Sequence, residues 1–167
     1  IHVHQMDKVK VAAAIANSAD RTIMFSRTKH GCERLERQIR KEGVTATAIH
    51  GDLRQNAREK ALNDFSSGRL PGLVATDVAA RGIPVDDVGV VIHFDPPEEH
   101  KTYQHRSGRT ARAGDEGLVV TLVLWDQELE VKRMQKRLGL ELPIVEMFSN
   151  DQRLDDLSSW DPHADEA

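Results

Sequence analysis

The stretch GLVATDVAARG at residues 72–82 joins a short apolar run to a polar turn, and it indicates how the chain folds. Residues 72–76 have the length and composition of a buried strand, and Thr76 stands where a helix can begin. Four further runs of this kind are expected as strands, at 21–25, 45–49, 88–94 and 117–124. Because these runs alternate with stretches of helical period, we predict an α/β fold with an open, mostly parallel sheet and helices on both faces.

Apolar stripes and end signals mark three of the helices. The first covers 29–42 and ends at Gly43, where a helix favours a residue that tolerates positive φ. The second lies between the second and third strands and closes at Gly68, and the third covers 126–139. The stripe of the first helix is Cys32, Leu35 and Ile39.

The composition is that of one folded domain in a reducing compartment. A hydrophobic share of 39% with 11 glycines is ordinary for a soluble globular chain. The single cysteine, Cys32, excludes an internal disulfide and a cysteine-rich zinc site. No apolar run approaches the ~20 residues of a membrane span. We therefore expect a cytoplasmic fragment of a longer protein, without membrane contact.

The two signs of charge are separated along the chain. Residues 1–140 hold 22 Lys and Arg against 19 Asp and Glu, a net of +3, whereas residues 141–167 hold 1 against 8, a net of −7. This separation predicts a folded domain over 1–140 and an acidic C-terminal extension over 141–167. The extension is expected to add one short strand and then to run over the surface as a solvated spacer, with partner docking as the alternative.

Glycines and polar side chains gather where the predicted strands end. They are Ser26-Arg27-Thr28, His50-Gly51-Asp52, Thr76-Asp77 and the stretch HRSGRTARAG at 105–114. In an open α/β sheet, ligands bind at the carboxyl ends of the strands, where helix N-termini present free N–H groups to anions. Arg106, Arg109 and Arg112 recur every three residues, so we expect them on one helix face, able to bind phosphate oxygens. Arginines on a solvated helix face with acidic neighbours are the usual alternative, but residues 106–112 include no acidic residue.

Together these groups resemble the motifs of the DEAD-box RNA helicases. TDVAARG at 76–82 resembles motif V, HRSGRTAR at 105–112 motif VI, IMFSRT at 23–28 motif IV, and Gln55 with Arg58 the Q-x-x-R element. The resemblance covers roughly residues 1–140 and is to the second, C-terminal RecA-like lobe only. The lead-in KTYQH at 101–105 is similar to a bacterial RhlE-like branch.

The resemblance implies catalytic and coupling roles for the residues of motif VI. Arg109 and Arg112 match the arginine fingers that reach the γ-phosphate of ATP held on the other lobe, where they would stabilise charge in the transition state. His105 and Arg106 match residues that couple the two lobes, with a plain helix-capping role as the alternative.

RNA contacts are implied at the strand ends. The matching residues are Arg27, Thr28, Gly51, Arg58, Thr76 and Asp77. A threonine hydroxyl and the N–H groups after it can take an RNA phosphate, whereas simple N-caps and turns are the structural alternative. Arg58 is expected either to contact the RNA backbone or to brace motif V. Because backbone contacts carry no base information, weak base preference is expected.

The nucleotide site that the resemblance implies is incomplete in this chain. The sequence has no G-x-x-x-x-G-K-[ST] phosphate loop, so ATP and Mg²⁺ are expected mainly on an N-terminal lobe, and no metal ligand is assigned here. Gly82 and Pro84 join Arg109 and Arg112 as the expected ATP-binding residues. Pro84 stands where most members place an aspartate that hydrogen-bonds the ATP ribose, so we expect weakened ATP capture.

We therefore interpret the chain as the C-terminal half of an ATP-dependent DEAD-box RNA helicase that opens short duplexes locally. The expected partners are RNA, the N-terminal lobe of the same protein, and proteins of RNA degradation or ribosome assembly. By itself the chain is expected to be inactive. The alternative is a non-catalytic RecA-like module that binds RNA or protein, and a DNA-translocating helicase lobe is a third interpretation.

Overall fold

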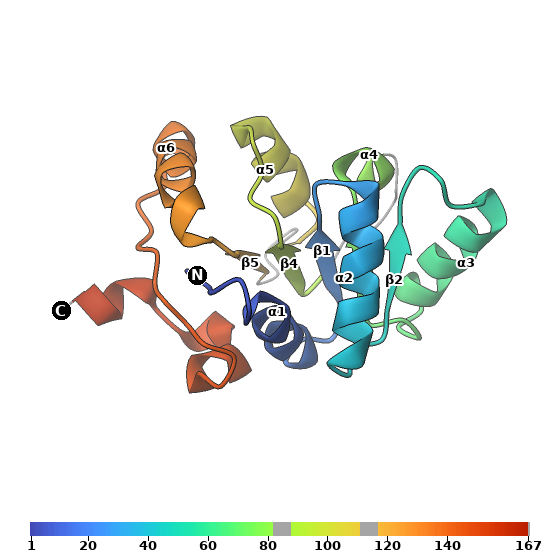
Figure 1. The fold of residues 1–167 in the computed structure, drawn as a ribbon, viewed down its shortest axis with the longest axis horizontal. Helices are drawn as coiled ribbons and strands as arrows, with labels where there is room; N and C mark the ends of the chain where they lie inside the picture. Colours follow the sequence, from blue (N-terminus) through green and yellow to red (C-terminus); the bar gives the residue numbers. More distant parts are fainter. Residues whose placement is uncertain (82–87, 111–116, 167) are drawn as a thin grey trace.

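A five-stranded sheet in the order β2-β3-β1-β4-β5 forms the centre of the molecule (Figure 1). The computed structural model describes residues 1–81, 88–110 and 117–166. The strands are β1 (Thr22–Phe25), β2 (Ala46–Ile49), β3 (Gly72–Ala75), β4 (Val90–His93) and β5 (Leu118–Thr121). Every pair of neighbouring strands is parallel. The predicted α/β class and parallel sheet are confirmed, and all five predicted strands contain the observed ones.

The register brings the carboxyl ends of the strands to one edge of the sheet. Phe25 pairs with Ala75 on one side and with His93 on the other. Ile49 pairs with Ala75, and His93 pairs with Thr121. The polar groups that follow these strands in sequence are therefore neighbours in space.

Helices cover both faces of the sheet. They are α1 (Lys8–Asn17), α2 (Lys29–Lys41), α3 (Gln55–Ser66), α4 (Asp77–Ala80), α5 (His100–Ser107) and α6 (Glu128–Leu138). The buried side chains of α1 and α2 pack in one hydrophobic cluster with Met24, Val74 and Ile92 of the sheet. Those of α3 and α4 pack in a second cluster with Ile23, Phe25 and other residues of the opposite face. Figure 1 shows α1 and α2 in front of the sheet.

The predicted helix ends are confirmed where a glycine was expected to stop the helix. The stripe of α2, Cys32, Leu35 and Ile39, is buried, and Gly43 follows with a φ of 90°. At the end of α6, Gly139 adopts the left-handed conformation with φ 71°, and its N–H bonds to the carbonyl of Lys136. Sequence analysis did not single out α1, whose alanine-rich stretch is buried on several sides.

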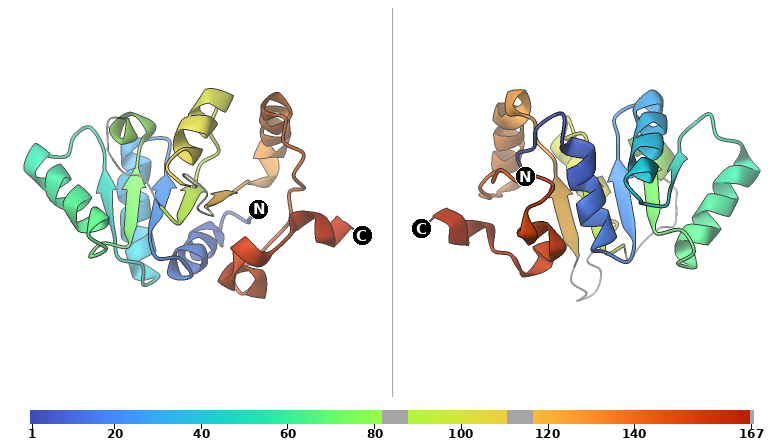
Figure 2. Two further views of the ribbon diagram at one scale, coloured as in Figure 1. Left: turned by 180° about the vertical axis from the view of Figure 1, so that it is seen from behind. Right: turned by 60° about the horizontal axis from the view of Figure 1, so that its bottom comes forward.

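The acidic extension departs from the expected solvated spacer. Met147, Leu154 and Leu157 are buried and belong to the same hydrophobic cluster as α1 and α2. Ser149 donates hydrogen bonds to the carboxylate of Asp7 from both its N–H and its hydroxyl, at 2.7 Å each. Figure 2 shows the segment wrapped beside α1. Its apolar residues lie in short 3₁₀ turns, which lack the helical period that sequence analysis looks for.

The short strand expected after residue 140 is reduced to an isolated bridge. His2 forms parallel bridges with Val123, just beyond β5, and with Glu146 of the extension. The first residues of the chain are thus held between the end of β5 and the extension. In the described part of the chain, none of the helices is both long and apolar enough to cross a bilayer.

Candidate functional site

The loop after β1 places two of the expected RNA-contact residues at the carboxyl edge. Thr28 is the N-cap of α2, and its Oγ1 accepts a hydrogen bond from the N–H of Gly31 at 2.9 Å. Arg27 is exposed, and its guanidinium donates to the carbonyl of Pro96 at 3.1 Å and lies 3.5 Å from the Glu98 carboxylate. Thr28 therefore caps α2, and both Thr28 and Arg27 are exposed where a ligand could contact them.

The turn after β2 is exposed and has a basic neighbour. Gly51 lies at the surface, and a Cβ at that position would stand 3.4 Å from Cε of Lys29. Nζ of Lys29 lies 3.0 Å from Oδ1 of Asp52, and this hydrogen bond lowers the pKa of that carboxyl. Sequence analysis did not single out Lys29, although its position directly after Thr28 placed it at the same edge.

The segment after β3 forms the short helix α4 and is braced from α3. Thr76 is the N-cap, and its Oγ1 accepts from the N–H of Ala79 at 3.3 Å. Nη2 of Arg58 donates to the carbonyl of Ala79 at 3.1 Å. Arg58 was expected either to contact the RNA backbone or to brace motif V. Its hydrogen bond to Ala79 is a contact with the segment of motif V.

Arg106 is the most buried charged side chain of the edge, with 2% of its surface exposed. Its Nε and Nη2 donate to the two carboxylate oxygens of Asp77 at 2.6 and 2.8 Å. Its Nη1 donates to the carbonyl of Asp95 at 2.8 Å, and its guanidinium lies over the ring of Phe25. Arg106 therefore has an acidic partner, which lies on α4 and not within residues 106–112.

Arg106 and Arg109 do not share one helix face, so the expectation that Arg106, Arg109 and Arg112 lie on one helix is wrong. Helix α5 ends at Ser107 with Gly108 as its C-cap, so Arg106 lies in the last turn and Arg109 lies beyond the end. Arg112, Gly82 and Pro84 fall outside the residues that the structure describes. Because α5 ends at Ser107, the three-residue spacing of the arginines does not place Arg109 on the same helix as Arg106.

Arg109 lies against the end of α4. Its Nη2 donates to the carbonyl of Ala80 at 2.8 Å. It lines a small cavity between α4 and α5 together with Phe25, Asp77, Ala80, Arg81, Thr102, His105 and Arg106. His105 is exposed on the last turn of α5. The structure thus brings Arg109, His105 and Arg106 together around one cavity, which also touches the helix that Thr76 begins.

His93 is a buried neutral histidine beneath this arrangement. It is 0% exposed, its ring stacks on that of Tyr103 at 4.9 Å, and its Nδ1 lies 3.2 Å from Nη1 of Arg106. Because a guanidinium can only donate, Nδ1 accepts. Burial, and then the charge of Arg106, hold the pKa of His93 well below its usual value of 6.5.

A pH dependence of stability follows from His93. Below pH 6.5 the unfolded chain binds a proton at this residue that the folded chain does not, so the free energy of unfolding falls as pH falls. At pH 5.5 we expect a loss of about 1.4 kcal/mol from this group. Urea unfolding of wild type and His93→Gln at pH 7.5 and 5.5 measures it, and the variant should lose less than wild type. An identical pH dependence in both proteins would contradict the assignment of a neutral His93.

Asp95, two residues beyond the end of β4, connects several of these groups and was missed in the sequence. Its Oδ2 accepts from the N–H of Arg27 at 2.8 Å and from Oγ of Ser26 at 3.1 Å. Its Oδ1 lies 3.3 Å from Nζ of Lys8. Burial alone would raise the pKa of Asp95, but the Arg27 hydrogen bond and the Lys8 charge outweigh it and keep the pKa below its usual value. The only available signal was an aspartate at the end of an apolar run.

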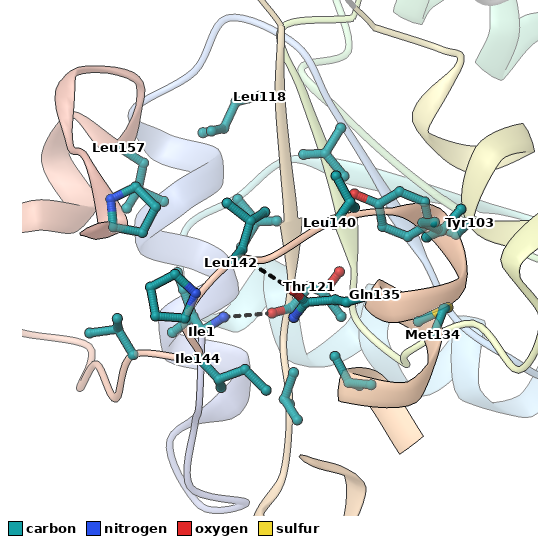
Figure 3. Close-up of a pocket in the computed structure, with 18 of the residues that line it drawn as sticks. Ile1, Tyr103, Leu118, Thr121, Met134, Gln135, Leu140, Leu142, Ile144 and Leu157 are labelled. Atoms are coloured by element: carbon teal, nitrogen blue, oxygen red, sulfur yellow. Dashed lines mark hydrogen bonds between the residues drawn. The ribbon is translucent and has the colours of Figure 1, made fainter. Parts of the chain in front are cut away.

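A larger cavity lies beside β5 and is lined mainly by apolar side chains. It measures about 250 Å³ and lies between β5, α6 and the extension (Figure 3). Leu118, Met134, Leu140, Leu142 and Leu157 are among its lining residues. Because its walls are mainly aliphatic, it does not suit a phosphate group.

The fold and the edge together define a RecA-like α/β domain with polar loops along one edge of its sheet. Residues 6–114 match the family model described as helicase conserved C-terminal domain. The chain belongs to this family, as the C-terminal RecA-like domain of the DEAD-box RNA helicases.

Curated relatives agree with this family. The chain is 48% identical over 123 residues to the ATP-dependent rRNA helicase RRP3 of Kluyveromyces lactis, which covers 73% of the chain and 25% of the relative. It is 43% identical over 114 residues to DEAD-box ATP-dependent RNA helicase 30 of Arabidopsis thaliana, covering 68% of the chain and 19% of that relative. The chain thus spans about a quarter or less of the length of these relatives.

Solved structures give the same fold. The Escherichia coli DEAD-box protein SrmB, bound to the regulator of ribonuclease activity A, aligns with a TM-score of 0.75 and 35% identity over 86% of this chain and 85% of that one. Saccharomyces cerevisiae Dbp5 bound to RNA and ADP BeF3 aligns with a TM-score of 0.80 and 27% identity over 94% of this chain and 42% of that one. The predicted family and fold are confirmed, whereas the bacterial RhlE-like branch stays a prediction.

Proposed function

We propose that this domain is part of an ATP-dependent RNA helicase and that it supplies Arg109 and Arg112 to ATP bound on an N-terminal lobe. The observation that carries the proposal is the cavity beside α4, where Arg109 contacts the carbonyl of Ala80. The same short helix begins at Thr76, an expected RNA contact. A single four-residue element therefore joins the expected RNA contact to the expected ATP contact.

RNA is proposed to follow the carboxyl edge across β1, β2 and β3. Thr28 and Thr76 each cap a helix there, Gly51 is exposed after β2, and Arg27 adds a positive charge. Helix N-termini and hydroxyl groups suit phosphate oxygens and carry no base information, so we expect weak base preference. The Asp77 carboxylate is held by Arg106, so its contribution to RNA binding would come through its backbone.

ATP and Mg²⁺ are proposed to be held mainly by the N-terminal lobe, with Gly82 and Pro84 on this side of the nucleotide. His105 is exposed and suits contact with the other lobe, whereas buried Arg106 would act by holding α4 against α5. Mg²⁺ would neutralise phosphate charge, and the guanidinium of Arg109 would stabilise the γ-phosphate as its bond breaks.

The partners and the location of the longer protein are inferred from the named relatives and from the composition. Relatives are named rRNA helicases, and solved neighbours carry the regulator of ribonuclease activity A or Gle1. We infer partners in ribosome assembly or RNA degradation for the longer protein. The single cysteine supports a cytoplasmic location.

The chain alone should hydrolyse no ATP above background, because the phosphate loop and the Mg²⁺ ligands are expected elsewhere. The test is phosphate release from purified chain with ATP, Mg²⁺ and RNA, compared with the longer protein under the same conditions. RNA-stimulated turnover by the pure chain would overturn the split-site proposal. Absence of RNA-stimulated turnover in the longer protein would favour a non-catalytic RecA-like binding module.

A further inference from the structure

Asp95 is the point at which three separate parts of the domain meet. Its carboxylate accepts from the N–H of Arg27 at 2.8 Å and from Oγ of Ser26 at 3.1 Å, in the loop after β1. Nζ of Lys8, the first residue of α1, lies 3.3 Å from the same carboxylate. Its backbone carbonyl accepts from Arg106 of α5 at 2.8 Å. One residue therefore links α1, the β1 loop and the arginine-bearing helix.

Lys8 is unusual for a lysine, because only 4% of its surface is exposed. Its Nζ lies 4.1 Å from the centroid of the Phe94 ring. A buried ammonium group is costly unless an acceptor or an opposite charge compensates for lost water. Lys8 finds both in Asp95, so the ion pair is part of the packing between α1 and the sheet edge.

The β1 loop is held by these contacts and by a close approach to α2. Ser26 and Arg27 each donate one hydrogen bond to Asp95. The side chain of Arg27 also donates to the carbonyl of Pro96 at 3.1 Å. A Cβ added at Gly31 would come within 2.5 Å of Oγ of Ser26, so the loop rests directly on the first turn of α2. The conformation of the loop is therefore fixed from two sides.

We propose that Lys8 and Asp95 form a positioning pair for RNA binding, which holds the β1 loop so that Arg27 and Thr28 face the RNA phosphates. This inference rests on the function proposed above. Neither residue needs to touch RNA. A loop that is already ordered loses less conformational entropy on binding, so the pair strengthens binding through preorganisation.

The test uses the longer protein and measures RNA-stimulated ATP hydrolysis as a function of RNA concentration. We expect Asp95→Asn and Lys8→Met each to raise the half-saturating RNA concentration about tenfold, a factor equivalent to about 1.4 kcal/mol. The rate at saturating RNA should change little, because Arg109 is untouched. Lys10→Met, an exposed lysine on the same helix, is the matched control and should behave as wild type.

A double-mutant cycle separates a pair from two independent structural effects. If the residues act together, the Lys8→Met, Asp95→Asn double variant should bind RNA no more weakly than Asp95→Asn alone. Additive losses would overturn the pairing. Urea unfolding of each variant reports any loss of fold.

Ser26→Ala keeps the inference testable where Asp95→Asn fails to fold. It removes one donor to the carboxylate and should raise the half-saturating RNA concentration about threefold, since a neutral donor contributes less than a charged one. Variants that match wild type in their RNA dependence would overturn the positioning role while leaving the proposed function intact. A wild-type protein without RNA-dependent hydrolysis would overturn both.

Discussion

Arg109→Ala in the longer protein should lower the rate of ATP turnover by about 10³, or roughly 4 kcal/mol. The reason is the position of Arg109 beyond the end of α5, where its guanidinium contacts the carbonyl of Ala80 and lines the cavity beside α4. An arginine finger acts mainly in the transition state, so its loss affects turnover far more than ground-state binding. Single-turnover hydrolysis at saturating ATP and RNA measures the effect.

The control for Arg109 is an arginine that the structure keeps away from the edge. Arg37 is exposed in the middle of α2, and Arg37→Ala should leave turnover unchanged. RNA affinity of Arg109→Ala should stay close to that of wild type. An Arg109→Ala protein that lost RNA affinity while keeping its turnover would reverse the assignment of this residue.

Arg106→Ala should destabilise the domain by about 3 kcal/mol, the lower end for breaking a buried ion pair. The lower end applies because Asp77 keeps 29% of its side chain exposed and can recover some water. The substitution also leaves the Asp95 carbonyl without its arginine donor and removes the guanidinium over Phe25. Urea unfolding of the chain at neutral pH measures the change in the free energy of unfolding.

Conservative variants distinguish the geometry of this pair from its charge. Arg106→Lys keeps the charge but cannot reproduce both hydrogen bonds to Asp77, so it should be intermediate. Asp77→Asn should also destabilise, because it leaves the buried guanidinium without its counter-charge. A change below about 0.5 kcal/mol in Arg106→Ala, the range of ordinary surface substitutions, would contradict a role in holding α4 against α5.

The sequence predicted the sheet well because its information is local. Each strand is a short apolar run, and α2 has both a clear apolar stripe and Gly43 at its end. The edge residues followed from the same reasoning, since parallel strands bring their carboxyl ends together. The α1 helix was missed because its alanine-rich stretch is buried on several sides and has no sharp polar face.

The contacts that sequence analysis missed are those between distant segments. Asp77 and Arg106 are 29 residues apart and meet only when α4 and α5 pack together. Lys8 and Asp95 are 87 residues apart, and neither belongs to a recognisable local pattern. The extension was misjudged because its net charge of −7 hid a few apolar residues that pack in short irregular turns.

The most direct test is whether this domain completes the ATP site of the longer protein. RNA-stimulated ATP hydrolysis should be measured in the intact protein and in a shortened protein that keeps the N-terminal lobe but lacks this domain. Loss of Arg109 and Arg112, the proposed arginine fingers, should reduce turnover by at least about 10³ while ATP binding to the remaining lobe persists. Hydrolysis by the shortened protein at the rate of the intact one would contradict the account.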